Sequence, residues 1–262
     1  MSKKVSTKSH ESGGVAAVNR ALSILTSFQR GDDGLTLAEL SKRTGLYKST
    51  VLRLIDSLIQ YDFFRRADDG RYHIGPAPLV LGSFYQRSLR LADIILPVMR
   101  ALVNLSGEGM SFYVRSGEVR LCLFRVDSEH EVRDHVRVGD MLPLEKGSGG
   151  RVLCAFLNMK GDIYKGIRRD YFCASYGERD SETAGISVPV FGPGGALLGA
   201  LTLAGPRSRV TASFIEKMRI PLLNAAAQVT TGSGGNAQSL QIAIAARSTG
   251  QPIKGKATRQ TA

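Results

Sequence analysis

The sequence predicts an α+β fold in two parts, a winged helix-turn-helix followed by a strand-rich domain. Residues 35–74 have, in order, the patterns of a capped helix, a glycine turn, a second amphipathic helix and a short hairpin. After residue 92, antiparallel candidate strands are bracketed by helices, which is typical of an α+β domain. A length of 262 residues allows two domains, each able to bury a core.

The helix-turn-helix begins at Thr36, a good N-cap residue, and Glu39 three positions later completes a capping box. Gly45 suits the left-handed residue that commonly ends a helix. The next helix begins near Tyr47 or Lys48, and apolar residues at helical spacing predict that one of its faces is buried. These residues are Val51, Leu54, Ile55, Leu58 and Ile59.

DNA binding is the function that this pattern favours. A helix-turn-helix places the N-terminal end of its second helix in the major groove, and here that end carries hydroxyl and basic side chains off the buried face. Residues 63–66 and 71–74 can pair across an Asp-Gly turn as a basic hairpin. The predicted contacts to double-stranded DNA are Thr36, Tyr47, Lys48, Ser49, Thr50, Arg53, Arg65, Arg66 and Arg71. The alternative is a small helical domain with a solvated basic face, because the same geometry occurs in domains that bind only protein.

Two segments flank this domain, which we place at residues 15–76. Residues 1–14 are polar and are expected to be a disordered tail. A first helix over Ala17–Phe28 contributes mostly to the core. Residues 77–91 are too apolar for a free linker, so they predict a linker helix that packs against its twin in a dimer or within the monomer. The apolar residues proposed for this packing are Leu79, Leu81 and Phe84.

The second domain is predicted over residues 92–232. A helix over Asp93–Ser106 opens it, and a helix within Ser208–Ala227 closes it. The candidate strands are Ser111–Arg115, Val119–Val126, Arg133–Val138, Gly185–Phe191 and Ala196–Ala204. Residues 233–262 are rich in Gly, Ser, Gln, Ala and Lys, so we expect a disordered tail, in which the apolar patch 242–246 could form a short helix.

Composition says more about the cellular compartment of the protein than about its function. The net charge of +12 is spread evenly along the chain, and a positive field attracts nucleic acid or anionic membrane without specifying either. The sequence contains no run of about 18 apolar residues, so we expect no transmembrane helix. The N-terminus lacks the apolar core of a secretory signal. The three cysteines are expected to be reduced thiols in a cytoplasmic protein.

Catalysis is the competing class of function. The sequence has no GxSxG elbow, no HExxH helix and no CxxC pair, so we assign no catalytic residue, no metal ligand and no cofactor. The alternatives that stay open are a small hydrolase-like enzyme and a metal-responsive winged-helix regulator. His130 and His135 near Cys122 could form a site, although solvated strand ends are the more common role for such histidines.

The glycine-rich loop at residues 146–151, KGSGGR, is the best candidate for ligand chemistry. Its glycines let backbone N–H groups approach an anion closely, and a helix starting at the end of the loop would add a favourable dipole. A small carboxylate is therefore the predicted guest. The loop fits neither GxxxxGK[ST] nor GxGxxG, and the alternative is a plain turn entering a helix.

Several runs of the sequence resemble one protein family. AVNRALSILTSF, GLTLAELSKRTGLYKSTVLRLIDSLIQYDFFRR and DGRYHIGPAPLVLG are similar to the N-terminal half of IclR-family bacterial transcription regulators. LPLEKGSGGRVLCAF and VPVFGPGGALLGALTLAGPRSR resemble two signatures of that family's effector-binding half. The resemblance, over residues 15–230, implies a winged helix-turn-helix, a linker helix and a GAF-like effector domain, assembled as a homodimer or homotetramer. It implies a ligand-responsive regulator that binds operator DNA.

The resemblance also implies where the effector binds. It places Ser148 and Gly149 at an anion-binding backbone position, and Thr202 and Ala204 on the pocket wall. Leucines near these residues are expected to supply the apolar walls that such pockets require. The predicted effector-binding residues are Leu142, Leu144, Ser148, Gly149, Gly150, Ser175, Gly185, Thr202, Leu203 and Ala204.

The sequence departs from the family pattern at two places. The segment 156–171 is shorter than the family's helical insertion, and this is expected to trim one wall of the pocket. Gly185 stands where a cysteine is frequent, and Ser175 stands where an aspartate is frequent. Acidic residues that could substitute for this aspartate are Glu178, Asp180 and Glu182.

Overall fold

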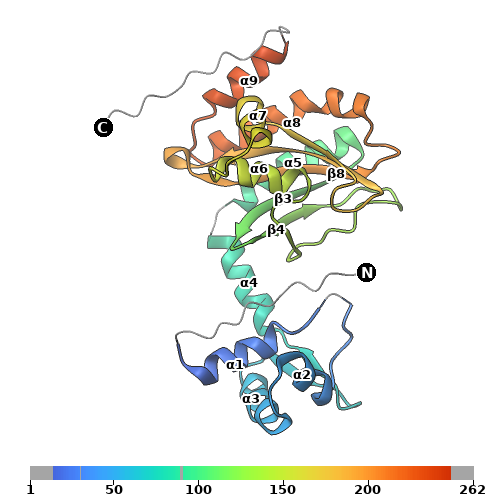
Figure 1. Cartoon of the computed structure of the whole chain (residues 1–262), viewed down its shortest axis with the longest axis vertical. Coiled ribbons are helices and arrows are strands. Elements are labelled where there is room, and N and C mark those ends of the chain that lie inside the picture. The colour runs from blue at the N-terminus through green and yellow to red at the C-terminus, as the bar shows by residue number, and fades with distance from the viewer. Residues whose placement is uncertain (1–13, 30, 89–90, 249–262) are drawn as a thin grey trace. The chain divides into compact units, whose positions relative to one another are not determined.

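The computed structural model describes residues 14–29, 31–88 and 91–248, and the chain divides into two compact units at residues 88 and 89 (Figure 1). The predicted N-terminal tail, apart from Gly14, lies outside the described residues, as does the end of the predicted C-terminal tail.

The N-terminal unit is a winged helix-turn-helix, as predicted, followed by the linker helix. Its helices are α1 (Ala16–Leu25), α2 (Leu37–Thr44), α3 (Lys48–Gln60) and α4 (Ala77–Ser88). The wing is an antiparallel hairpin of β1 (Phe64–Arg66) and β2 (Tyr72–Ile74). The core lies between α1, α2, α3 and the wing, and its most buried members are Ile24, Leu40, Val51, Ile55 and Phe64.

Local sequence signals explain the boundaries of α2. The Thr36 hydroxyl accepts a hydrogen bond from the Glu39 N–H at 3.2 Å, and the Glu39 carboxylate accepts one from the Thr36 N–H at 2.8 Å. This capping box satisfies donors that the first turn would otherwise leave free. Gly45 ends the helix in the left-handed conformation with φ of 72°, which a residue without Cβ adopts at little cost.

The C-terminal unit is an α+β domain of the GAF-like kind built on one six-stranded antiparallel sheet, in the order β5-β4-β3-β8-β7-β6. The strands are β3 (Gly109–Ser116), β4 (Val119–Val126), β5 (Met141–Pro143), β6 (Cys173–Tyr176), β7 (Thr183–Phe191) and β8 (Leu197–Pro206). The helices are α5 (Ala92–Ser106), α6 (Gly147–Phe156), α7 (Asp162–Asp170), α8 (Ala212–Gly232) and α9 (Gln238–Ser248), with a short 3-10 turn at Pro193–Gly195.

The two faces of the sheet carry different helices. One face packs against α5 and α8 in a large apolar core that includes Ile186 and Leu203. The other face packs against α6 and α7 in a smaller core that includes Tyr113 and Cys122. Because side chains alternate along a strand, Thr202 lies on the α6 face while its neighbour Leu203 lies in the α5–α8 core. The glycine-rich loop therefore lies over the more polar face.

Two expectations about the second unit are wrong. Residues 133–138 form no strand: the chain there is irregular, and β4 pairs instead with β5. The tail beyond residue 232 is not wholly disordered, because its apolar patch lies in α9. Leu240 and Ala243 of α9 are almost fully buried, so packing on the rest of the unit anchors a helix that the sequence pattern marks only weakly.

Neither a membrane-spanning helix nor a metal cluster is present in the described residues. No helix in these ranges is long and apolar enough to cross a bilayer. The same residues contain no cluster of three or more His, Cys, Asp or Glu side chains that could hold a metal ion.

Candidate functional site

The first candidate site is the exposed N-terminal end of α3. Tyr47 precedes the helix and is 85% exposed, and Lys48, Ser49 and Arg53 are exposed beside it. Unlike α2, this helix has no side-chain cap at its N-terminus. Its first N–H groups can therefore donate to a phosphate, the usual partner of a free helix N-terminus.

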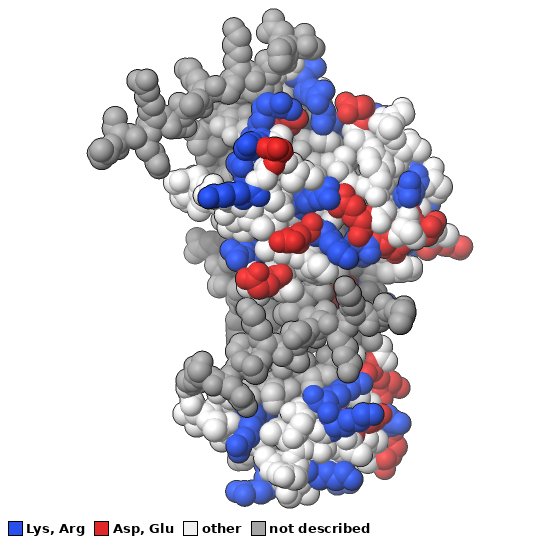
Figure 2. Space-filling view, viewed as in Figure 1, with Lys and Arg blue, Asp and Glu red and all other residues white. Residues whose placement is uncertain are grey.

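The wing adds basic groups to the same unit. Arg65 and Arg66 are exposed, and the Arg66 guanidinium lies over the Tyr72 ring at 5.7 Å. Arg71 donates to the Gly34 carbonyl at 3.2 Å, which fixes its direction. Figure 2 shows Lys and Arg side chains over this unit. The Thr36 hydroxyl is engaged in the capping box, and its predicted contact with DNA stays a prediction.

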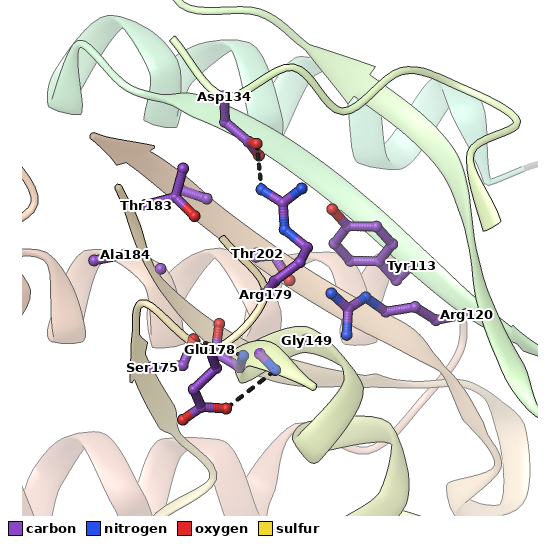
Figure 3. Close-up of a pocket in the computed structure, with 14 residues that line it drawn as sticks. Tyr113, Arg120, Asp134, Gly149, Ser175, Glu178, Arg179, Thr183, Ala184 and Thr202 are labelled. Atoms are coloured by element: carbon purple, nitrogen blue, oxygen red, sulfur yellow. Dashed lines mark hydrogen bonds and ion pairs between the residues drawn. The ribbon is translucent and has the colours of Figure 1, made fainter. Parts of the chain in front are cut away.

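The second candidate site is a cavity between the N-terminus of α6 and the polar face of the sheet (Figure 3). Its free volume is about 30 Å³, which is room for about one or two water molecules. A larger guest requires some of the lining side chains to move. The lining residues are Tyr113, Arg120, Asp134, Gly147, Ser148, Gly149, Ser175, Glu178, Arg179, Thr183, Ala184, Gly185, Thr202 and Ala204.

The first turn of α6 forms one wall of the cavity with its backbone. Gly147 has φ of 76°, a conformation that favours glycine. Its N–H donates to the Glu178 carboxylate at 3.2 Å, and the N–H of Ser148 donates to the Ser175 hydroxyl at 2.9 Å. The donors predicted to hold an acid are thus partly occupied by acceptors from the chain itself.

The hydroxyl groups of Ser148 and Thr202, which line the cavity, are linked through the buried hydroxyl of Ser187. The Ser187 hydroxyl donates to the Ser148 hydroxyl at 2.8 Å and lies 2.8 Å from the Thr202 hydroxyl. All three side chains are buried. Hydroxyl groups both donate and accept, so the Ser148 and Thr202 hydroxyls can reorient to suit a polar guest.

Arg120 is a functional candidate that the sequence pattern did not single out. It is only 3% exposed, and its guanidinium donates to the carbonyls of Pro143, at 3.1 Å, and Lys146. No ion pair among the described residues includes it, and its Nε has no hydrogen-bond partner there. Burial lowers the pKa of this guanidinium. A buried cation without a carboxylate partner is costly, and it lies where an anionic guest would meet it.

Asp134 is a second buried charged group among the residues that line the cavity. Asp134 is 4% exposed and pairs with both Arg179 and Arg125, the latter at 3.7 Å. Figure 3 shows the Arg179 side chain, which follows Glu178 in the sequence, reaching to Asp134. These pairs hold the irregular segment that replaces the predicted strand at residues 133–138.

The structure brings together six of the ten predicted effector residues and not the other four. Those that line the cavity are Ser148, Gly149, Ser175, Gly185, Thr202 and Ala204. Ser175 and Gly185 are direct cross-strand partners, and of the three acidic candidates it is Glu178 that contacts α6.

The four remaining residues do not line this cavity. Leu203 lies on the opposite face of the sheet, in the α5–α8 core. Leu142 and Leu144 pack in the smaller apolar core. A Cβ on Gly150 would collide with the Leu144 carbonyl oxygen, so this glycine is needed for close packing of the backbone. The leucines predicted as apolar walls therefore belong to the cores on either side of the sheet and not to this cavity.

The alternative site considered from the sequence, His130 and His135 near Cys122, has no reactive thiol. Burial raises the pKa of Cys122 to about 12, so the thiol stays protonated at neutral pH. Only a thiolate is an effective nucleophile or metal ligand.

Comparisons with known proteins agree with this architecture. The IclR helix-turn-helix domain matches residues 17–68, and the bacterial transcriptional regulator IclR C-terminal domain matches residues 83–165. The chain is 24% identical to the transcriptional repressor IclR of Escherichia coli over 254 residues, which is 85% of this chain and 92% of that protein.

Solved structures show the same fold. An IclR transcriptional regulator from Silicibacter has a TM-score of 0.71 at 25% identity, over 84% of this chain and 96% of that one. An IclR homologue from Microbacterium hydrocarbonoxydans, crystallised with 4-hydroxybenzoate, has a TM-score of 0.72 at 22% identity, over 82% of this chain and 98% of that one.

A winged helix-turn-helix joined to an effector-type domain defines a class of DNA-binding transcription regulators. Within that class, the chain belongs to the IclR family of bacterial transcriptional regulators. Its relatives are named as regulators and repressors, so the protein is a regulator and not an enzyme.

Proposed function

We propose that the protein is a regulator whose affinity for operator DNA changes when a small carboxylic acid binds in the cavity beside α6. The observation that carries this proposal is Arg120, a buried guanidinium with no carboxylate partner among the described residues. It faces the N-terminal turn of a helix, which is itself an anion-binding element. A carboxylate between the Arg120 guanidinium and this turn would accept hydrogen bonds from both.

The DNA-binding end of the proposal rests on α3. The hydroxyl groups of Ser49 and Thr50 can reach base edges, while the uncapped helix N-terminus and the wing arginines can hold phosphates. One recognition helix covers only a few base pairs, so we infer that at least two copies of the chain bind a pseudo-palindrome. The linker helix α4 supports this, because Leu79 is 78% exposed and Phe84 is 57% exposed in the single chain.

The recognition helix is tested with duplex DNA selected from a random-sequence library by repeated binding. The double variant Ser49→Ala with Thr50→Ala should weaken binding to the selected DNA by about tenfold, since each of the two hydroxyl contacts contributes about 0.5–1.5 kcal/mol. Leu157→Ala, a change in the other unit, is the control. If the double variant binds the selected DNA as tightly as wild type, α3 is not the recognition helix.

The ligand is tested with matched pairs of an acid and its neutral amide. The pairs are 4-hydroxybenzoate with 4-hydroxybenzamide, pyruvate with pyruvamide, and acetate with acetamide. An acid that binds the folded protein raises the Tm by mass action, and its amide should not, because it cannot pair with Arg120. The same acid should change DNA affinity by about 5–150-fold. Acids and amides that act alike would contradict a carboxylate effector.

A further inference from the structure

The carboxylate of Glu178 occupies the place where an acid effector would meet α6. One of its oxygens accepts the hydrogen bond from the Gly147 N–H at 3.2 Å, and the other lies 2.6 Å from the Arg151 guanidinium. Its side chain is 24% exposed, so the contact is at the edge of the cavity, open to solvent. Figure 3 shows the Glu178 side chain directed at the start of the helix. The chain itself therefore shows that this turn accepts a carboxylate.

Glu178 does not pair with Arg120, the buried guanidinium that lines the same cavity. Its ion pair is with Arg151, and no described carboxylate pairs with Arg120. Yet Arg120 lies against the same turn: a Cβ on Gly147 would be 3.4 Å from its Nη2. A free carboxylate at this position could contact the helix N-terminus and Arg120 together, which Glu178 does not do.

We propose that Glu178 is a built-in competitor of the effector, and that the effector is a compact carboxylate that takes its place at Gly147 and also pairs with Arg120. This inference rests on the proposed function of the cavity. The effector carboxylate would replace the Glu178 carboxylate at the N-terminus of α6. Its binding would be favoured by the additional charge-assisted contact with Arg120. The small free volume, about 30 Å³ with Glu178 in place, is the volume of the occupied site.

The exchange gives the effector a way to move the structure. Glu178 and Arg179 are neighbours in the turn between β6 and β7, and Arg179 pairs with Asp134 of the irregular segment. Displacing Glu178 frees one of the charged anchors of this turn. A ligand shifts a conformational equilibrium only through contacts that differ between two states, and the Glu178 contact is such a difference.

The test uses the full-length protein, with sodium acetate as the probe and sodium chloride at equal ionic strength as the reference. The backbone amide signals of Gly147 and Gly177 are followed by NMR during the titration. The variants are Glu178→Gln, which removes the competing charge, and Glu182→Gln, which removes the same charge from an exposed residue of the same turn. Glu178→Gln should bind acetate about tenfold more tightly than wild type, the scale of one charge at a helix N-terminus, and Glu182→Gln should match wild type.

In wild type, the Gly177 signal should move with that of Gly147, because the turn is released as acetate binds. In Glu178→Gln, only Gly147 should move. If wild type and Glu178→Gln bind acetate equally, or if Glu178→Gln binds it more weakly, the competitor role is wrong although a carboxylate site stands. If the Gly147 signal responds in neither protein, the turn takes no external carboxylate, and both this inference and the proposed effector site fail.

Discussion

Replacing Arg120 with methionine should remove acid binding while leaving the protein folded. Arg120 is buried, and its Nε has no partner among the described residues. The variant loses the hydrogen bonds to the Pro143 and Lys146 carbonyls, but it also removes the cost of a buried, unpaired charge. Methionine fills most of the volume that the arginine stem leaves. These effects oppose each other, so the free energy of unfolding should change by about 1 kcal/mol or less.

The effect on the acid should be much larger. Hydrogen bonds to charged groups contribute about 1.5–3 kcal/mol each, and each 1.4 kcal/mol corresponds to a factor of about ten in affinity. Removing one such hydrogen bond between Arg120 and the acid therefore weakens binding by about tenfold to a hundredfold. A second bond between the guanidinium and the carboxylate would make the effect of the substitution larger.

The assay is calorimetric titration of the best acid from the screen into wild type, Arg120→Met and Arg115→Met. Arg115 is the cross-strand partner of Arg120, but its side chain is 44% exposed. The control therefore removes the same charge from the same hairpin without changing the cavity. If Arg120→Met keeps its Tm and binds the acid as tightly as wild type, Arg120 is not the anchor and the reasoning from its missing partner is wrong.

Three further predictions concern the N-terminal unit. Thr36→Ala should lower the free energy of unfolding of this unit by about 1 kcal/mol, because it removes the acceptor that caps α2; an unchanged urea midpoint would show that the capping box is dispensable. Arg66→Ala should weaken binding to all duplex sequences alike and lower the slope of log affinity against log salt by about 0.9, whereas a sequence-dependent loss would make Arg66 a base contact. Leu79→Glu with Phe84→Glu should convert a dimer into a monomer in light scattering, since both side chains are exposed in the single chain; a wild-type protein that is already monomeric, free and on DNA, would disprove the paired arrangement.

The winged helix-turn-helix could be predicted closely because its signals are local. The capping box at Thr36 and Glu39 and the glycine at position 45 act within one or two turns of chain. The apolar spacing of α3 then fixes which face is buried. Each of these signals can be found in a short window of sequence, and each has the predicted geometry.

The cavity could be predicted only in part, because its residues meet through tertiary contacts. Ser175 and Gly185 become informative once β6 and β7 are paired in register. Arg120 lies in an apolar run, and its position two residues before the buried Cys122 places both on one face of β4. That alternation could have predicted that Arg120 is buried. It could not have predicted that the guanidinium lies against the first turn of α6.

Two errors have clear physical causes. Leu203 adjoins Thr202 on a strand, and neighbouring residues on a strand point to opposite faces, so both could not line one cavity. Residues 133–138 alternate like a strand, but Asp134 is held by Arg125 and Arg179. The contact with Arg179 joins residues 45 positions apart in the sequence, so a short window could not reveal it. The backbone of residues 133–138 is held by these charged contacts and is not part of the sheet.

The central claim is that one acid couples the cavity beside α6 to DNA binding, and reciprocal titration tests it most directly. The dissociation constant of the acid is measured with and without the selected duplex, and that of the duplex with and without the acid. Thermodynamic linkage requires the same factor in both directions, expected at about 5–150-fold. Equal factors that vanish together in Arg120→Met are the predicted result. An acid that binds in the cavity with no change in DNA affinity would contradict the claim.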